Sequence, residues 1–262
     1  MTIAPDLWTL LERSQHRFVT AQPPPQEGGR PALDTCGTTV IAVKFDGGVL
    51  NVGDRRATAN FAVMYDHAEK VLAVDEVTLI AISGSYARSL EVVRYLRTSF
   101  KLFERTYLQP MSLDGKLAEL TRVVRAGVPE ALQGIGGFIP VFSTFDLEAG
   151  EGRIFFYDGM GARFESAEFG AAGSGSMQIR GVFDYIVKTL GPFHKMPRTD
   201  ALRQALIMLD IAADLDAATG GFAKILPVAR AITAGGIVDV PDDELLKLVD
   251  ELRTPGQQAH QG

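Results

Sequence analysis

Two apolar runs joined by a tight turn constrain this chain more than any other feature. Residues 40–45 are mostly β-branched or apolar, which is typical of a buried strand. Asp46-Gly47-Gly48 follows, and aspartate and glycine tolerate the positive φ angles of a hairpin turn. If Asp46 and Gly47 form the turn, Phe45 pairs with Gly48 and Thr39 lies opposite Asp54; a turn one residue later shifts this register by two. Either way, hairpin geometry brings a carboxylate beside the Thr38 hydroxyl.

A second hairpin repeats this design. The apolar runs 70–74 and 77–82 flank Asp75-Glu76, and a two-residue turn there sets Lys70 opposite Ala81. Lys70 and Gly84 then lie about one residue apart along the strand direction. The sequence therefore predicts a lysine and a glycine loop at one end of this hairpin. The pattern alone does not say whether Thr38 lies at that end.

Composition limits the classes of function open to the chain. At 262 residues with 46% hydrophobic residues, it suits one large domain or two small ones with a substantial core. A net charge of −6 argues against nucleic acid or an anionic membrane as a partner. The single cysteine, Cys36, excludes an intramolecular disulfide and favours a reducing compartment. Signal-peptide and membrane-spanning patterns are absent, so we expect a cytoplasmic protein.

The first 37 residues differ from the rest of the chain. Residues 5–19 can form a short amphipathic helix, and residues 21–34 are a linker rich in Pro, Gly and Gln. Cys36 is interpreted as a small leader residue rather than a nucleophile. Nothing before Gly37 is expected to belong to the core. The segment is either a disordered tail or a removable propeptide that ends at Gly37.

Beyond the hairpins, helical and strand patterns alternate in blocks. Amphipathic periodicity and capping residues, Ser112 and Thr199 among them, predict helices at 86–107, 112–132, 177–190, 200–215 and 244–252. Strand patterns occur at 139–145, 152–157, 162–169, 225–233 and 236–240. This order suits two antiparallel sheets stacked face to face with helices outside. The order alone does not separate this layout from other α+β folds.

Several short motifs occur together in this chain. They are Gly37-Thr38-Thr39, Gly53-Asp54-Arg55-Arg56-Ala57-Thr58, Lys70, Ser83-Gly84-Ser85, Gly173-Ser174-Gly175-Ser176 and Asp216-Ala217-Ala218-Thr219-Gly220-Gly221. Each alone has a structural explanation, such as a solvated ion pair or a turn. In this order and spacing they resemble proteasome β-subunits of the bacterial type, which are N-terminal nucleophile hydrolases. The resemblance implies a four-layer αββα sandwich at residues 38–262 and a propeptide at residues 1–37.

The resemblance also implies a threonine protease. Thr38 would be the nucleophile through its hydroxyl and the base through an α-amino group freed by cleavage, since such a group has a pKa of ~7.7–8. Lys70 would stay protonated and lower the proton affinity of Thr38, with Asp54 holding Lys70 in place. The Gly84 N–H would face the oxyanion. The hydrogen-bond set around the Thr38 amine would be Ser174, Asp216 and Thr219, where Thr219 replaces a frequent serine.

Maturation would occur at the Gly37–Thr38 bond. The Thr38 hydroxyl would attack its own preceding carbonyl, an N-to-O acyl shift would follow, and water would hydrolyse the ester. Glycine at position 37 would permit the tight backbone bend that this attack needs. The mature chain would then have 262 − 37 = 225 residues.

Substrate preference is predicted from matching positions. The pocket for the side chain before the scissile bond would be lined by Ala57, Ala68, Leu72, Ile82, Tyr86 and Leu90. This lining contains no charge, so we expect cleavage after apolar residues. Thr58 and Gly84 would hold the substrate backbone as an added strand.

The partners implied are proteasome α-subunit rings, further copies of this chain in heptameric β rings, a ring ATPase and unfolded protein substrates. No cofactor or metal is expected, and the four histidines, His16, His67, His194 and His260, are interpreted as structural or surface residues. A catalytically silent subunit that keeps its leader is one alternative, against which the set of Thr38, Asp54 and Lys70 argues. A simpler two-ring peptidase without α partners is another, against which the long leader argues.

Overall fold

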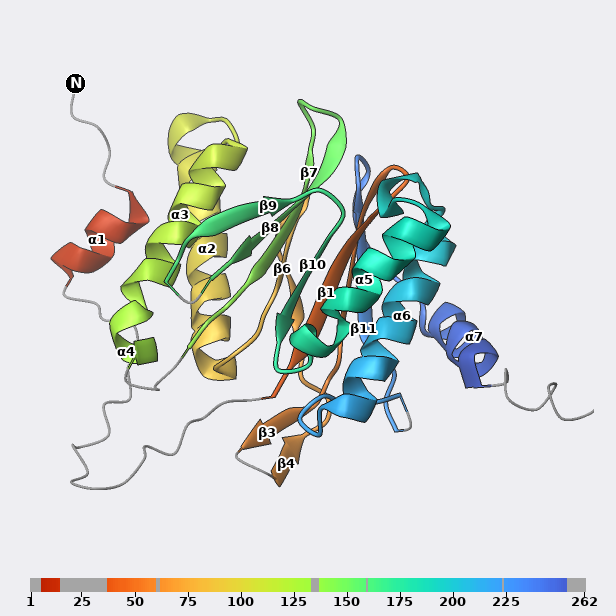
Figure 1. The fold of residues 1–262 in the computed structure, drawn as a ribbon. Helices are drawn as coiled ribbons and strands as arrows, with labels where there is room; N and C mark the ends of the chain where they lie inside the picture. Colours follow the sequence, from red (N-terminus) through yellow and green to blue (C-terminus); the bar gives the residue numbers. More distant parts are fainter. Residues whose placement is uncertain are drawn as a thin grey trace, which may run out of the picture.

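The chain folds into four layers (Figure 1). The computed structural model describes residues 6–14, 37–59, 62–132, 137–158, 160–222 and 224–253. Within these residues the strands form two five-stranded antiparallel sheets and a separate two-stranded hairpin. The large sheets stack face to face, and helices cover both outer faces. The predicted αββα arrangement is therefore confirmed.

The first sheet has the strand order β10-β1-β2-β11-β12. Its strands are β1 (Thr39–Phe45), β2 (Gly48–Gly53), β10 (Phe169–Gly173), β11 (Val228–Thr233) and β12 (Gly236–Asp239). Phe45 pairs with Gly48, which confirms the predicted register of the first hairpin. The turn glycine Gly47 has φ 92°, the conformation that a glycine there permits. Asp54 follows β2, and its N–H donates to the Thr39 carbonyl at 3.2 Å.

The second sheet has the order β5-β6-β7-β8-β9. Its strands are β5 (Val71–Asp75), β6 (Thr78–Ala81), β7 (Val141–Asp146), β8 (Glu151–Tyr157) and β9 (Arg163–Ser166). The predicted pairing of Lys70 with Ala81 is wrong by one residue, because Val71 pairs with Ala81 and the Lys70 carbonyl accepts from the Ile82 N–H at 2.8 Å. A register shift between Ala73 and Asp75 causes the difference.

The stretch 162–169, predicted as one strand, contains β9 and only the first residue of β10, and residues 170–173 of β10 were not predicted as a strand. β9 ends at Ser166, whose hydroxyl accepts from the Phe169 N–H at 3.2 Å and closes the turn. β10 then pairs with β1, with Gly173 opposite Thr39. This crossing brings the glycine–serine motif that starts at Gly173 beside the start of β1. The small hairpin of β3 (Ala57–Ala59) and β4 (Ala62–Tyr65) was not predicted.

Helices cover the outer face of each sheet. They are α1 (Leu7–Arg13), α2 (Tyr86–Tyr107), α3 (Leu113–Ala126), α4 (Val128–Leu132), α5 (Ser176–Leu190), the 3₁₀ helix η1 (Phe193–Lys195), α6 (Arg198–Leu215) and α7 (Asp242–Arg253). The prediction for 86–107 is confirmed. The helix predicted at 112–132 is interrupted at Gly127, and Pro129 follows, so it divides into α3 and α4. α6 begins one residue before Thr199, after Pro197 in the capping position.

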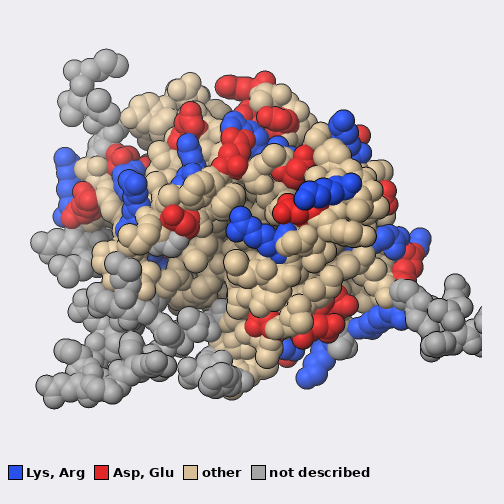
Figure 2. Space-filling model, viewed as in Figure 1, with Lys and Arg blue, Asp and Glu red and all other residues tan. Residues whose placement is uncertain are grey.

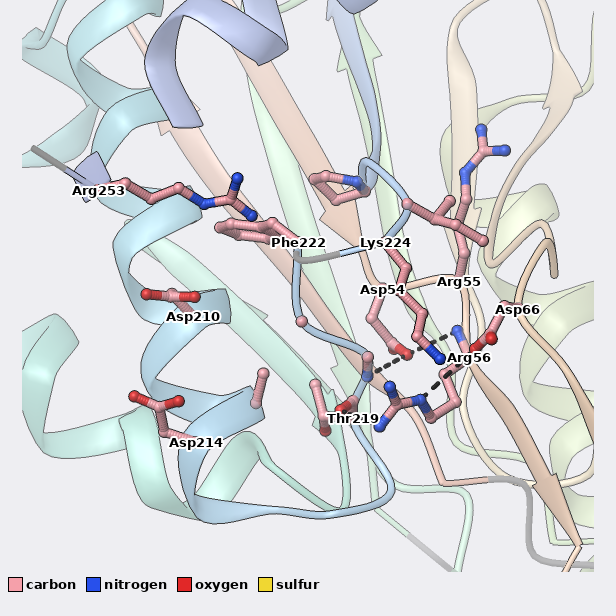
Figure 3. Close-up of a pocket in the computed structure, with 15 residues that line it drawn as sticks. Asp54, Arg55, Arg56, Asp66, Asp210, Asp214, Thr219, Phe222, Lys224 and Arg253 are labelled. Atoms are coloured by element: carbon pink, nitrogen blue, oxygen red, sulfur yellow. Dashed lines mark hydrogen bonds and ion pairs between the residues drawn. The ribbon is translucent and has the colours of Figure 1, made fainter. Parts of the chain in front are cut away.

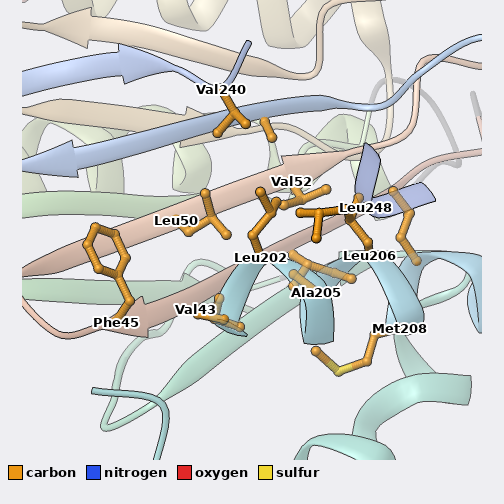
Figure 4. Packing of buried hydrophobic residues seen from close by; sticks show 14 of the residues in the cluster. Val43, Phe45, Leu50, Val52, Leu202, Ala205, Leu206, Met208, Val240 and Leu248 are labelled. Atoms are coloured by element: carbon orange, nitrogen blue, oxygen red, sulfur yellow. The ribbon is translucent and has the colours of Figure 1, made fainter. Parts of the chain in front are cut away.

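Three apolar layers hold these elements together. One lies between the first sheet and α5, α6 and α7; Figure 4 shows Val43, Leu50 and Val52 of the sheet facing Leu202 and Leu206 of α6. A second lies between the second sheet and α2 and α3. A third fills the space between the sheets. Burial of these continuous layers is the main stabilising term of such a fold.

The leader contributes to one of these layers. Leu7, Trp8 and Leu11 of α1 pack against the apolar cluster of α2 and α3. These residues are only partly buried, and α1 has no fully buried residue, so the leader helix covers the core without adding a buried residue to it. Asp6 caps this helix by accepting from the Thr9 N–H at 2.8 Å. The linker at residues 21–34 and Cys36 lie outside the described residues.

The surface carries both signs of charge. On the face shown in Figure 2, Lys and Arg are interspersed with Asp and Glu rather than gathered in one basic area. Among the described helices, none has the length and apolarity needed to cross a lipid bilayer.

Candidate active site

A buried ion pair lies at the start of β1. The Lys70 Nζ is 2.8 Å from Oδ1 and 2.9 Å from Oδ2 of Asp54, and both side chains are at most 1% exposed. The same ammonium donates to the Gly37 carbonyl at 3.2 Å and to the Arg56 carbonyl. An ammonium has three N–H donors, so one carboxylate and two carbonyls provide a matching set of acceptors. The open question of the second hairpin is thereby answered, since Lys70 lies at the Thr38 end.

Three backbone N–H groups fix the Asp54 carboxylate. Oδ1 accepts from Thr39 at 2.9 Å, and Oδ2 accepts from Arg56 at 3.0 Å and from Gly220 at 2.9 Å. These donors come from β1, from the segment after β2 and from the loop after α6. Charge-assisted bonds of this kind are stronger than neutral ones. Asp54 therefore ties three segments, distant in sequence, to the lysine.

Gly37 is held tightly in front of Thr38. Its N–H donates to the Thr58 hydroxyl at 2.9 Å, and its carbonyl accepts from Lys70. A Cβ at this position would lie 1.9 Å from the Ala218 Cβ, so no larger residue fits without movement of that loop. Close approach to Ala218 is therefore one physical reason for a glycine at this position.

The predicted polar set is assembled around Thr38 and Thr39. The Ser174 hydroxyl lies 2.5 Å from Oδ2 of Asp216 and 3.4 Å from the Thr38 carbonyl oxygen. Thr219 donates from its hydroxyl to the same Asp216 oxygen at 2.6 Å. The resemblance implied these three side chains around the Thr38 amine; in the structure they lie together beside the Thr38 carbonyl and the Thr39 hydroxyl.

Thr39 is a site residue that the sequence analysis missed. Its hydroxyl is 2.6 Å from the Thr219 hydroxyl and accepts from the Gly175 N–H at 3.2 Å. Because Thr219 donates to Asp216, Thr39 must donate to Thr219. A relay of hydrogen bonds thus joins β1 to the loop after α6. The sequence signal for Thr39 was the pair of adjacent threonines, Thr38 and Thr39. A second hydroxyl on a buried strand has no unique interpretation, so this signal did not identify Thr39 as a site residue.

Arg56 is a second residue that was missed. Its guanidinium Nη1 donates to the Ala217 carbonyl at 3.2 Å and to the Thr219 carbonyl at 3.3 Å. Its own carbonyl accepts from Lys70 and its N–H donates to Asp54. Arg56 therefore links the ion pair to the loop that carries Asp216 and Thr219. No short motif encodes a contact between residues that lie so far apart in sequence.

Gly84 lies where the chain leaves the second sheet. It has φ 92°, and a Cβ there would lie 2.1 Å from the Gly137 carbonyl oxygen. Hydrogen bonds from Ser85 N–H to Gly137 and from Ile139 N–H to Ser83, at 2.7 and 3.2 Å, flank its bridge with Phe138. In such a pair the central residue points its own N–H away from the partner strand. The N–H of Gly84 therefore points away from Phe138, and the flanking hydrogen bonds fix its position.

The residues predicted to line the substrate pocket are mostly buried. Ala57, Ala68, Leu72 and Ile82 are at most 9% exposed. Tyr86 and Leu90, on the first turns of α2, pack with Leu72 and Ile82 against the same apolar cluster. The Tyr86 hydroxyl accepts from the Glu69 N–H at 3.2 Å. Four of the six residues thus share one apolar environment beside Lys70.

Comparisons with known proteins agree with this geometry. A family model described as "Proteasome subunit" matches residues 35–228. A proteasome subunit beta of Acidothermus cellulolyticus is 36% identical over 232 residues, covering 86% of this chain and 78% of the relative. Thermomonospora curvata proteasome subunit beta 2 is 34% identical, covering 87% and 80%. A Parafrankia proteasome subunit beta is 36% identical, covering 85% and 80%. The chain belongs to the proteasome β-subunit family.

Membership of this family of protein-degrading hydrolases agrees with the sandwich of two sheets between helix layers. It implies assembly with proteasome α subunits and with further β copies. The described residues contain no group of three His, Cys, Asp or Glu placed to hold a metal ion.

A pocket of about 400 Å³ lies next to this site of the β subunit (Figure 3). Asp54 and Thr219 border it, whereas Thr38 and Lys70 are not among its lining residues. It is rich in charge of both signs, from Arg55, Arg56, Asp66, Asp210, Asp214, Lys224 and Arg253. Burial and the neighbouring Asp214 carboxylate raise the pKa of Asp210 above its usual value. This pocket is therefore chemically unlike an apolar site for a substrate side chain.

Proposed function

We propose that this chain is the proteolytic β subunit of a bacterial proteasome core particle, an N-terminal threonine protease that processes itself at Gly37–Thr38. The observation that carries the proposal is the Lys70 ammonium, buried between the Asp54 carboxylate and the carbonyl oxygen of Gly37. That carbonyl belongs to the bond to be cut. A fixed positive charge beside it polarises the carbonyl and favours the negative charge that develops on attack.

Processing begins when the Thr38 hydroxyl attacks the Gly37 carbonyl carbon. The Gly37–Thr38 C–N bond breaks, an ester to the Thr38 oxygen forms, and the Thr38 nitrogen takes up the proton as a free amine. Water then hydrolyses the ester, so residues 1–37 leave with a terminal carboxylate and the threonine hydroxyl is regenerated. The buried position of Thr38, 3% exposed, keeps bulk water away during the attack.

The freed amine then acts as the base for substrate cleavage. Its pKa of ~7.7–8 leaves a useful neutral fraction near pH 7. It accepts the hydroxyl proton, directly or through a water, while Thr38 attacks the substrate carbonyl; the leaving amine receives the proton, and water cleaves the acyl-enzyme. The outward N–H of Gly84 supports its role as oxyanion donor, worth about 3 kcal/mol in comparable sites. Ser174, Asp216 and Thr219 hold the amine.

Substrate residues enter as an added strand. The Thr58 hydroxyl, which accepts from the Gly37 N–H, provides the position for a substrate N–H, with Gly84 on the opposite side. The apolar lining from Leu72, Ile82, Tyr86 and Leu90, with Ala57 and Ala68, favours apolar side chains before the cut bond. Faster hydrolysis of fluorogenic peptides ending in Leu than in Arg is expected.

The wider setting of this proposal follows from the family. Heptameric rings of this chain would stack between α-subunit rings in the cytoplasm, and a ring ATPase would feed them unfolded proteins. Residues 1–37 would be a propeptide that keeps the subunit a zymogen, and residues 38–262 the catalytic domain. No cofactor is needed for this chemistry.

Intact mass after co-expression with a proteasome α subunit tests the proposal. We expect a chain of 225 residues beginning at Thr38, labelled on that residue by an epoxyketone probe, and no cleavage or labelling in Thr38→Ala. A particle that keeps residues 1–37 and resists the probe would instead support a silent ring subunit. A particle of β rings alone that hydrolyses peptides would support the simpler two-ring peptidase.

A further inference from the structure

The leader helix α1 rests on a defined surface of α2 and α3 (Figure 1). The Trp8 ring meets the Tyr95 ring edge-on, with centroids 6.0 Å apart. The Arg122 guanidinium lies over the Trp8 ring, 5.2 Å from its centroid, and is 3.6 Å from the Asp6 carboxylate. Edge-on aromatic pairs and cation–π contacts are each specific in geometry. We name the surface formed by Tyr95, Glu119 and Arg122 the leader-docking surface.

Contacts within the domain hold the leader-docking surface in place. The Tyr95 hydroxyl donates to Oε2 of Glu119 at 2.7 Å, and Arg122 forms an ion pair with the other carboxylate oxygen. Tyr95 and Glu119 are buried, at 5% and 8% exposure. Because the carboxylate is buried and shared, the guanidinium is fixed where it meets the indole. The surface is thus built into the domain and does not arise from the leader.

The docked helix depends on this surface for its conformation. Isolated helices shorter than ~12–15 residues are marginal in water, and α1 has only 7 residues. Its apolar residues Leu7, Trp8 and Leu11 are partly buried and pack against the α2–α3 cluster. Stable interfaces between separate chains use ~20–30 residues a side, far more than α1 provides. A covalent connection, however, raises the effective concentration to the millimolar range.

We infer that α2 and α3 carry a docking site for the leader helix of the same chain, occupied only while the leader is covalently attached. Severing the leader turns an intramolecular contact into a weak bimolecular one, so the helix dissociates and the leader-docking surface becomes exposed. This inference goes beyond the proposed function, because it requires only that the leader be cut, by any agent.

Trp8 is the only tryptophan in the sequence, so its fluorescence reports on the docking site alone. The test uses the full chain with Thr38→Ala and a recognition sequence for a specific protease placed within residues 21–34. Before the cut, we expect acrylamide to quench Trp8 several-fold less than it quenches a synthetic peptide of residues 1–20. After the cut, quenching should reach the peptide's level, and the leader should elute separately in gel filtration at micromolar concentration.

A matched pair of leader variants provides the control. Leu11 packs on the domain, whereas Leu10 on the outer side of α1 is 41% exposed. Leu11→Glu should abolish the protection of Trp8 from acrylamide quenching, and Leu10→Glu should preserve it, although both substitutions add the same charge to the same helix. Equal quenching in the two variants, or co-elution of the severed leader, would overturn the inference. Self-processing has no part in this test, so failure of the proposed function gives a separate result.

Discussion

At the scale of single residues, the contacts around Asp54 and Lys70 decide what this site can do. A buried lysine is tolerated only when its charge is compensated, and here a carboxylate and two carbonyls surround it. The carboxylate in turn is held by backbone N–H groups. The pair is therefore part of the fold as well as part of the proposed chemistry, and a test must separate the two.

Lys70→Met tests the ion pair. Removal of one partner leaves Asp54 buried without its counter-ion, so we expect a loss of ~3–5 kcal/mol in the free energy of unfolding and no leader removal. Denaturant titration and intact mass measure the two effects. The double variant Lys70→Met with Asp54→Asn should recover part of the stability and none of the processing. Leader removal at the wild-type rate in either variant would contradict the proposed role.

Gly37→Ala tests the steric explanation for the glycine before the cut. The new Cβ would lie 1.9 Å from the Ala218 Cβ. We therefore expect leader removal to slow by roughly tenfold or more, because each ~1.4 kcal/mol added to the activation free energy lowers a rate tenfold. Time courses of intact mass measure the rate. Adding Ala218→Gly should restore the rate only in part, because the Ala218 Cα and O stay 2.8 and 2.9 Å from the new atom. No change in rate for Gly37→Ala would refute this explanation.

At the scale of elements, strand β10 matters most because it brings Ser174 to Thr38. Its last residue, Gly173, lies opposite Thr39 with φ 106°, and a Cβ there would lie 1.8 Å from the Thr38 carbonyl oxygen. A glycine therefore allows the strand to end beside the nucleophile. From the sequence, this glycine was interpreted as part of a turn and the predicted strand ended at Phe169, so most of β10 was not predicted, because its small residues carry little strand signal.

Substitution of two glycines by alanine should have opposite effects. Gly173→Ala should destabilise the domain, by ~1–3 kcal/mol for the φ angle alone, with a further steric cost. Gly181→Ala, on the exposed face of α5 with no atom within 4 Å of the new Cβ, should stabilise it by ~0.5–1 kcal/mol. Thermal and denaturant unfolding measure both. A stabilising Gly173→Ala would be inconsistent with the close approach of β10 to Thr38.

At the scale of the whole molecule, the stacking of the two sheets fixes the relation between Thr38 and Lys70. Thr38 precedes a strand of the first sheet, and Lys70 precedes a strand of the second. Two polar contacts between described residues interrupt the apolar layer between them: Arg230 of the first sheet donates to the Val71 carbonyl of the second, and Ser143 donates to Asn51 Oδ1 at 2.8 Å. Ser143 and Asn51 are fully buried, and Asn51 Nδ2 has no hydrogen-bond partner among the described residues.

Ser143→Ala tests this contact between the sheets. Loss of the donor leaves Asn51 buried with its carbonyl unsatisfied, so we expect a loss of ~1–3 kcal/mol in stability. The double variant Ser143→Ala with Asn51→Leu replaces both polar groups by apolar ones and should recover most of it. A double-mutant cycle from denaturant unfolding gives the coupling. Additive losses in the cycle would mean that the contact contributes nothing.

The sequence by itself determined most strands of the two large sheets, the first hairpin register and the long helix at 86–107, because these depend on local periodicity and on turn residues such as Gly47. Its motifs also identified the family. The positions of Arg56 and Thr39 in the site, the pairing of β10 with β1 and the packing position of α1 were decided only by the tertiary structure. Each depends on contacts between residues far apart in the chain, and no local pattern records which distant surface an exposed or polar side chain will meet.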